Sequence, residues 1–256
     1  MKGQTVMNNT DRGYPHPVSA GVGATAVDPK LRAFMIGVYN KVGLGLLVSA
    51  GLAYLTSSVP EVRDLLFKTA SDTHRLIGLR GLGAFTALSP LLAIVGFGMT
   101  DEVSAKRARL LYWSMVSTIG ASLGVTFLAY TAASIATAFA ASAAGFGALS
   151  LWGYCTKRDL KPVASFWITG LIGLLVMIGL NLIFRSPAIS FAMNALGVMI
   201  FAGLIAYDTQ RLKTFFHENQ HDAMRMRAGT DIGALSLYLD FINLFQFLLA
   251  LTGGRR

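Results

Sequence analysis

The sequence predicts an all-α membrane protein with seven transmembrane helices. Three observations support this fold class: the composition, the charge-free runs and the placement of basic residues. Of the 256 residues, 54% are apolar and only 14% are charged, against roughly 25% charged residues in ordinary soluble domains. The mean hydropathy is +0.55. So few charged residues cannot cover a soluble globule of this size, and the apolar content also excludes a disordered chain.

The net charge of +9 bears on the partners of the chain. Nucleic-acid binding needs a basic, solvated face, whereas a membrane protein gathers Lys and Arg in its cytoplasmic segments. We therefore expect membrane lipid around the chain and no nucleic-acid partner. Cys155 is the only cysteine, so the chain forms no internal disulfide and no cysteine-based zinc cluster.

Long charge-free runs define the predicted spans, because a bilayer core needs about 20 apolar residues of helix. The third run is long enough for two helices with a tight turn near residues 130–133, which brings the count to seven. The last run contains one charge, Asp240, so six spans with a re-entrant last segment are the main alternative. The runs are residues 42–60, 81–100, 110–156, 162–184, 186–207 and 232–254.

The segment ahead of the first span is polar and contains Pro15, Pro17 and Pro29. It predicts a flexible N-terminal tail, residues 1–30, followed by a seven-helix transmembrane domain, residues 31–256. No apolar segment follows the start, so the tail does not resemble a cleaved signal peptide. The tail and the turns after spans two, four and six hold fifteen Lys and Arg, against seven on the other side. This bias predicts a multi-pass protein with a cytoplasmic N-terminus.

Small residues recur about every four positions in the fourth span. Such a face allows close packing of helices in lipid, and close packing is what we expect of it. The residues are Ala132, Ala133, Ala136, Ala140, Ala144 and Gly147.

Two acids stand apart, because the other eleven are predicted to lie in tails or loops. Asp208 lies at the inner end of span six and Asp240 lies within span seven. An ionisable group in a span is costly and by default marks a functional site. Asp240 lies about 12 Å deep, and Asp208 lies at a similar depth if helix six continues toward Lys213. Antiparallel neighbours would then bring the carboxylates together.

Neighbouring buried carboxylates cannot both ionise cheaply, so they titrate as a pair. A shared proton would hold helices six and seven together, whereas deprotonation would repel them and admit a cation. Asp240 also belongs to a polar stripe with Ser236, Asn243 and Gln246, which indicates a face directed into the bundle. These residues are candidates to line the path, and interhelical hydrogen bonding is the alternative.

Three segments resemble the Bax inhibitor-1 (transmembrane Bax inhibitor motif) family, most closely its bacterial YccA/YetJ-like members. Residues 234–245, ALSLYLDFINLF, resemble the signature of the last helix. Residues 206–213, AYDTQRLK, are similar to the end of the sixth helix. Residues 129–139, AYTAASIATAF, are similar to the turn and start of the fourth helix. With the seven spans, the resemblance covers residues 30–254.

The resemblance implies a seven-helix bundle with a central last helix in a bacterial inner membrane. It also implies a calcium leak controlled by pH through two aspartates, which match Asp208 and Asp240. Calcium would be the permeant ion, and no cofactor is implied. In the family an arginine near the inner end of helix two pairs with the aspartates. Residues 98–102, GMTDE, contain no arginine, so Arg107 and Arg109 are the candidate partners.

A different function is also open. Some bacterial members resemble regulators of a membrane-bound AAA protease. The alternative is therefore an interaction protein that restrains such a protease without conducting ions, with the N-terminal tail as a contact.

His217, Glu218 and His221 match the pattern HExxH, which on a helix places two imidazoles as zinc ligands and the glutamate as base. Here the pattern lies in a hydrophilic turn between two spans, and Asp222 follows directly. We expect a solvated turn without a metal; a metalloprotease and adventitious metal binding are the alternatives.

An intramembrane aspartyl protease also requires two aspartates on adjacent helices. Tyr207 and Asp208 are similar to the Tyr-Asp pair of such enzymes. Their second aspartate follows Gly-x-Gly, whereas Asp240 follows Leu-Tyr-Leu. We therefore expect that the protein is not an enzyme.

Overall fold

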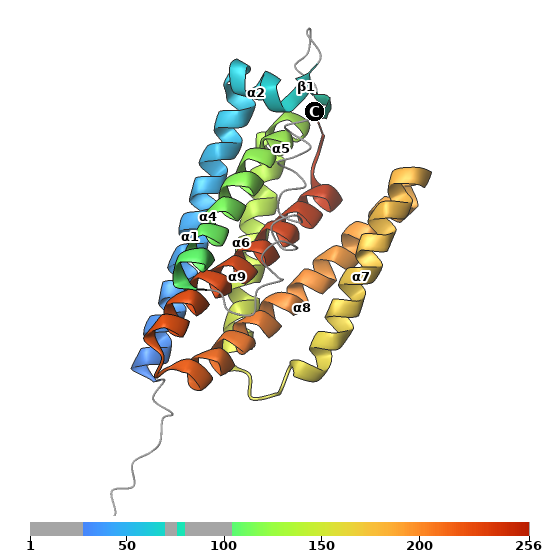
Figure 1. Ribbon diagram of the computed structural model, residues 1–256. Coiled ribbons are helices and arrows are strands. Elements are labelled where there is room, and N and C mark those ends of the chain that lie inside the picture. The colour runs from blue at the N-terminus through green and yellow to red at the C-terminus, as the bar shows by residue number, and fades with distance from the viewer. Residues whose placement is uncertain (1–27, 70–75, 80–103, 256) are drawn as a thin grey trace, which may run out of the picture.

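A computed structural model describes residues 28–69, 76–79 and 104–255 and shows a bundle of long helices with a short hairpin at one end (Figure 1). A two-stranded antiparallel hairpin joins Phe67–Thr69 (β1) to Leu76–Leu79 (β2), directly after the short helix Pro60–Leu66 (α2). The other helices are Pro29–Ser58 (α1), Ala105–Ser122 (α4), Gly124–Ala129 (α5), Ala132–Cys155 (α6), Lys161–Phe184 (α7), Pro187–Asn219 (α8) and Ala223–Thr252 (α9).

Six helical segments in the described ranges are long and apolar enough to cross a membrane, with α4 and α5 counted as one. Helix α7 shows the environment that such helices need. It packs against α8, and most of its exposed surface is apolar, with Phe166, Ile172 and Ile183 more than half accessible. A continuous apolar face of this kind is unfavourable in water and favourable in lipid. The chain is therefore an all-α membrane protein.

The predicted spans agree with the helices in position but not always in length. The turn near residues 130–133 is confirmed, since α5 ends at Ala129 and α6 begins at Ala132. The run 162–184 coincides with α7. Helix α8 continues past residue 207 to Asn219, and α9 begins at Ala223, well before residue 232. The predicted span 81–100 lies outside the described residues.

Local sequence signals explain where the helices begin. Side-chain oxygens of Asp28, Ser104, Thr131 and Asp222 each accept a hydrogen bond from a backbone N–H of the first helical turn. These bonds satisfy amides that have no partner within the helix. Asp222 accepts two, from the amides of Met224 and Arg225, at 2.9 and 3.0 Å. The polar residues around it therefore form a tight turn between α8 and α9 rather than a long loop.

Helix α9 packs against α1, α4, α6 and α8. Leu237 and Tyr238 in its middle are fully buried. The Tyr238 hydroxyl lies 2.7 Å from the hydroxyl of Ser49 on α1, and that serine donates to the carbonyl of Val116 on α4 at 3.1 Å. Aromatic and polar contacts thus join α1, α4 and α9 into one core.

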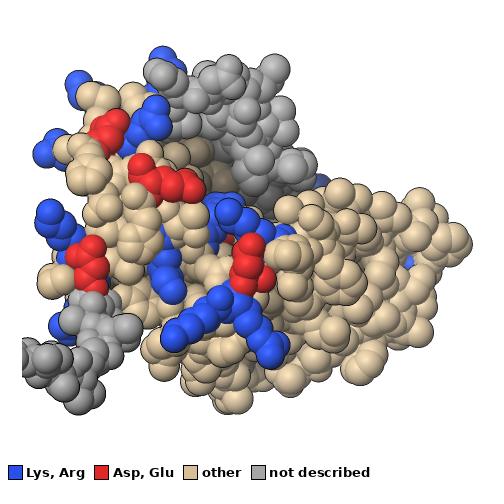
Figure 2. All heavy atoms as spheres, turned by 90° about the horizontal axis from the view of Figure 1, so that it is seen from below, with Lys and Arg blue, Asp and Glu red and all other residues tan. Residues whose placement is uncertain are grey.

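We call the end of the bundle where α1 begins, α6 ends and α8 turns into α9 the basal end (Figure 1). Seen from this end, Figure 2 shows Lys and Arg side chains gathered over its surface, with fewer Asp and Glu between them. This clustering agrees with the charge bias in the sequence. The basic residues that belong to this end are Lys30, Arg32, Lys106, Arg107, Arg109, Lys157, Arg158, Lys161, Arg211, Lys213, Arg225 and Arg227.

The prediction that the other eleven acids lie in tails or loops is wrong for Asp231, which lies within α9 and is 1% exposed. Its carboxylate forms an ion pair with the ammonium group of Lys41 on α1. The backbone carbonyl of Lys41 in turn accepts a hydrogen bond from the Tyr112 hydroxyl on α4. A buried carboxylate is tolerated when it is paired in this way.

The expectation of close packing along the small residues of α6 is also wrong. Those six residues are exposed, and the buried positions of α6 include Ala138, Ser142 and Gly153 instead. Gly153 lies against the backbone of Ala206 on α8, so any side chain there would overlap with it. Close approach therefore involves a different face of α6 from the one that the spacing favoured.

Asp231→Ala should destabilise the protein strongly, because it leaves the Lys41 ammonium partly buried without its counterion. Loss of one partner from a buried pair costs about 3 kcal/mol at the low end of the usual range. The thermal unfolding midpoint in detergent measures the effect.

The control is Asp64→Ala, which removes the exposed partner of the Arg63–Asp64 pair and should change the midpoint little. The double variant Lys41→Met with Asp231→Leu should recover most of the loss. Equal midpoints for Asp231→Ala and wild type would show that the pair contributes nothing.

Candidate functional site

Helices α8 and α9 run antiparallel and approach closely through glycines. Leu212 and Phe215 of α8 occupy the space beside Gly233 and Gly229 of α9, where an added Cβ would overlap with them. Phe247 of α9 lies in the same way against Gly197 of α8. The pair Gly229 and Gly233 has the four-residue spacing of small residues at helix contacts in membranes. These contacts fix the register of the two helices.

This register places Asp208 of α8 beside the part of α9 that contains Asp240. Both residues are buried, with 8% and 5% of their surface exposed, and the two carboxylates lie within electrostatic range of each other. The continuation of helix six past Lys213, on which the predicted juxtaposition depends, is present in the structure. The structure thus brings together the two aspartates that the sequence singled out.

Arg211 joins the two helices at this point, and sequence reasoning missed it. One guanidinium nitrogen lies 3.5 Å from a carboxylate oxygen of Asp208, one turn earlier on α8. The other terminal nitrogen donates to the hydroxyl of Ser236 on α9 at 3.2 Å. Arg211 follows Asp208 by three residues, and this spacing places both side chains on one face of a helix. The spacing is the feature of the sequence that could have identified the pair.

Arg107 and Arg109, the predicted partners of the aspartates, are exposed on the first turns of α4. Neither forms an ion pair with Asp208 or Asp240 among the described residues. Among the arginines that the structure describes, Arg211 is the one that forms an ion pair with Asp208.

The remaining residues of the polar stripe on α9 differ in their surroundings. Asn243 is half-buried, and its amide donates to the Leu239 carbonyl of its own helix at 2.8 Å. Gln246 is exposed. Within the described residues, one carboxylate oxygen of Asp240 has no hydrogen-bond partner. The stripe therefore contributes Ser236 and Asp240 to the contact with α8, but not Asn243 or Gln246.

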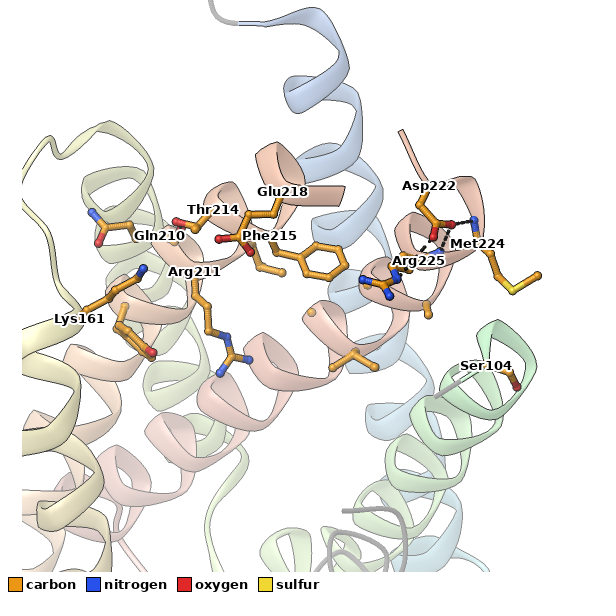
Figure 3. Close-up of a pocket in the computed structure, with 16 residues that line it drawn as sticks. Ser104, Lys161, Gln210, Arg211, Thr214, Phe215, Glu218, Asp222, Met224 and Arg225 are labelled. Atoms are coloured by element: carbon orange, nitrogen blue, oxygen red, sulfur yellow. Dashed lines mark hydrogen bonds and ion pairs between the residues drawn. The ribbon is translucent and has the colours of Figure 1, made fainter. Parts of the chain in front are cut away.

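A cavity of about 980 Å³ opens at the basal end, between α8 and α9. Figure 3 shows Arg211 and Glu218 on its α8 side and Asp222 and Arg225 near the start of α9. Lys161, at the start of α7, also borders it. Arg211 both lines this cavity and contacts Asp208, so it lies between the cavity and the buried carboxylates.

The charges at the contact balance in one protonation state. With a single proton on the two carboxylates, their charge of −1 is offset by Arg211. Loss of that proton leaves the group of three with a net negative charge in a buried place, where charge is costly unless it is paired. Such a group favours either a proton or a cation, and this is the chemistry that the arrangement permits.

Comparison with known proteins assigns the family. The family described as inhibitor of apoptosis-promoting Bax1 matches residues 31–256. The chain belongs to the Bax inhibitor-1 family. The resemblance carried by the last helix is therefore confirmed.

Bacterial members of the Bax inhibitor-1 family are similar to this chain over most of its length. An uncharacterized protein of Caulobacter vibrioides is 51% identical, over 98% of this chain and 100% of its own. The protein RP147 of Rickettsia prowazekii is 37% identical, over 90% and 92%. The inner membrane protein YbhL of Escherichia coli is 38% identical, over 88% and 93%.

The HExxH pattern of this family member is divided between a helix and a turn. His217 and Glu218 belong to the last turn of α8, which ends at Asn219, whereas His221 follows in the turn. All three are exposed. A zinc site of the metalloprotease type needs both histidines on one face of a continuous helix. Among the described residues, no group of three or more His, Cys, Asp and Glu is placed to hold a metal ion.

The purified protein should therefore retain no stoichiometric zinc after dialysis against buffer, as measured by elemental analysis. The variant His217→Ala with His221→Ala should give the same value. One tightly held zinc per chain that disappears in this variant would show that the turn rearranges into a metal site.

Proposed function

We propose that this chain is a pH-sensitive calcium-leak protein of a bacterial inner membrane, and that the contact between α8 and α9 is its gate. The observation that carries the proposal is the burial of Asp208 and Asp240 between two antiparallel helices, with Arg211 beside them. In this proposal the bundle has seven spans around the last helix.

The proposed orientation places the basal end in the cytoplasm. The gathering of Lys and Arg there supports it, because cytoplasmic segments of membrane proteins carry an excess of these residues (Figure 2). The name of the Escherichia coli relative supports an inner membrane. The N-terminus, ahead of α1, then lies in the cytoplasm as well.

In the closed state the two aspartates share a proton, and Arg211 offsets the remaining negative charge. The guanidinium also bridges Asp208 on α8 and Ser236 on α9, so it helps to hold the helices together. Because the group is neutral, the buried contact provides no attraction for a cation. The close fit of Phe215 and Leu212 against the glycines of α9 keeps the helices in contact.

Loss of the shared proton opens the gate in this mechanism. The carboxylates then repel each other, and the contact between α8 and α9 weakens by an amount comparable to the small free-energy gap between two arrangements of a helix bundle. The net negative charge that remains attracts a divalent cation. Arg211 must move away from the path for calcium to pass, since it lies between the basal cavity and the carboxylates.

Calcium flux into proteoliposomes at pH 6 and pH 8 tests this function. Wild-type protein should conduct severalfold faster at pH 8, because the shared proton is lost. Asp240→Asn and Asp208→Asn should conduct slowly at both pH values, because an amide cannot supply the charge that opens the contact.

Asp64→Asn, which changes an exposed carboxylate on α2, is the matched control and should keep the wild-type profile. Arg211→Gln removes the bridge to Ser236 and should raise the flux at pH 6. If both aspartate variants keep the wild-type profile, these residues are not the sensor. If no reconstituted protein conducts at either pH, the alternative of a protease regulator gains support.

A further inference from the structure

A second, apolar groove lies on the outside of the bundle at the basal end, between α1 and α6. Its volume is about 450 Å³. Ile36 of α1 and Leu151 of α6 form its walls and are 46% and 64% exposed. Tyr39 and Phe146 meet edge to face at its inner end, with ring centroids 6.2 Å apart. The groove is thus closed toward the middle of the membrane and open on its outer side.

The groove is long enough for part of an acyl chain. Arg32 borders it near the start of α1, and Tyr39 closes it seven residues later, a distance of roughly 10 Å along a helix. The groove therefore runs parallel to the helices, from the membrane surface at the basal end into the adjoining part of the hydrocarbon core. An aqueous solute would gain little from walls that are almost entirely apolar.

Gly147 of α6 shows that protein atoms leave this space open. A Cβ added at Gly147 would meet no heavy atom within 4 Å. Ser150, one turn further along, is buried beneath the groove, with 5% of its surface exposed. Both residues line the groove.

The outer end of the groove is positively charged. Arg32 lines it, and the Lys213 ammonium lies 5.3 Å from the ring centre of Tyr154, which also lines it. Lys213 is held there by a hydrogen bond to the Tyr154 carbonyl. The nearby carboxylate of Asp28 accepts a hydrogen bond from the backbone N–H of Lys30. A guanidinium binds a phosphate through two parallel hydrogen bonds, which makes Arg32 suited to a lipid headgroup.

We infer that this groove binds an anionic phospholipid, with one acyl chain between α1 and α6 and the headgroup phosphate on Arg32. The charge at its outer end distinguishes an anionic lipid from a zwitterionic one, and the apolar walls accept the chain. The site is separate from the contact of Asp208 and Asp240, and it does not depend on ion conduction.

A photoreactive lipid tests the site on the full-length protein in detergent. Phosphatidylglycerol and phosphatidylcholine, each with the same diazirine-bearing acyl chain, are cross-linked to the wild-type chain, and the labelled peptides are mapped by mass spectrometry. Phosphatidylglycerol should label the segments around Ile36 and residues 147–151 several times more strongly than phosphatidylcholine does. Equal labelling by the two lipids, or labelling spread evenly over α7 and α8, contradicts the proposal.

Two substitutions test the acyl-chain contact and the headgroup contact separately. Gly147→Leu fills the groove and should reduce labelling roughly tenfold, which corresponds to about 1.4 kcal/mol. Gly173→Leu is the matched control, because Gly173 also lies exposed in a span with nothing within 4 Å of an added Cβ. Arg32→Gln should abolish the preference for phosphatidylglycerol, whereas Arg107→Gln, at the same end of the bundle, should keep it.

Unchanged labelling in Gly147→Leu would overturn the proposal. A chain that lacks residues 1–27 tests a competing occupant. If its groove takes up severalfold more lipid than that of the full chain, the N-terminal segment covers the groove and lipid is not its resident ligand. Unchanged uptake supports the lipid.

Discussion

The contact between α8 and α9 combines close helix packing with a group of charges that is balanced in only one protonation state. Gly229 and Gly233 let the two helices approach, and the same approach removes Asp208 and Asp240 from water. Without the glycines the carboxylates would be hydrated and independent. With them, a single proton decides whether the buried group is neutral, so packing converts a small electrostatic change into a force between two helices.

The other side of α9 is held differently. Asp231 lies nine residues before Asp240, which places the two on opposite faces of the helix, and its partner is Lys41 of α1. Tyr112 and Tyr238 extend this second polar contact between α1, α4 and α9. Helix α9 is thus anchored to α1 through opposite charges and faces α8 through like charges. In this account α8 moves, and α1, α4 and α9 form the part that stays fixed.

The sequence predicts the positions of the helices, which depend on composition along the chain. It predicts fewer of the contacts between helices. Charge-free runs predict the positions of the long helices that the structure describes, and the cost of burying a carboxylate singles out Asp208 and Asp240. The early start of α9 is not predicted, because charged residues extend this helix beyond its apolar core, whereas the continuation of α8 toward Lys213 agrees with the expectation from the sequence. Asp231 falls outside the predicted span for the same reason. The small residues of α6 predicted packing, whereas Gly147 borders an open groove. The role of Arg211 depends on Ser236, which lies on another helix, so spacing along the chain does not predict it.

The separation of α8 and α9 as a function of pH tests the central claim most directly. Spin labels at Glu218→Cys on α8 and Arg227→Cys on α9, both exposed positions, report this separation when Cys155 is replaced by Ser. Pulsed electron paramagnetic resonance in lipid nanodiscs then gives the distance distribution between them. The account predicts a shorter distance at pH 6 and a longer one at pH 8, with the change abolished by Asp240→Asn. Identical distributions at both pH values in the protein with Asp240 intact would contradict it.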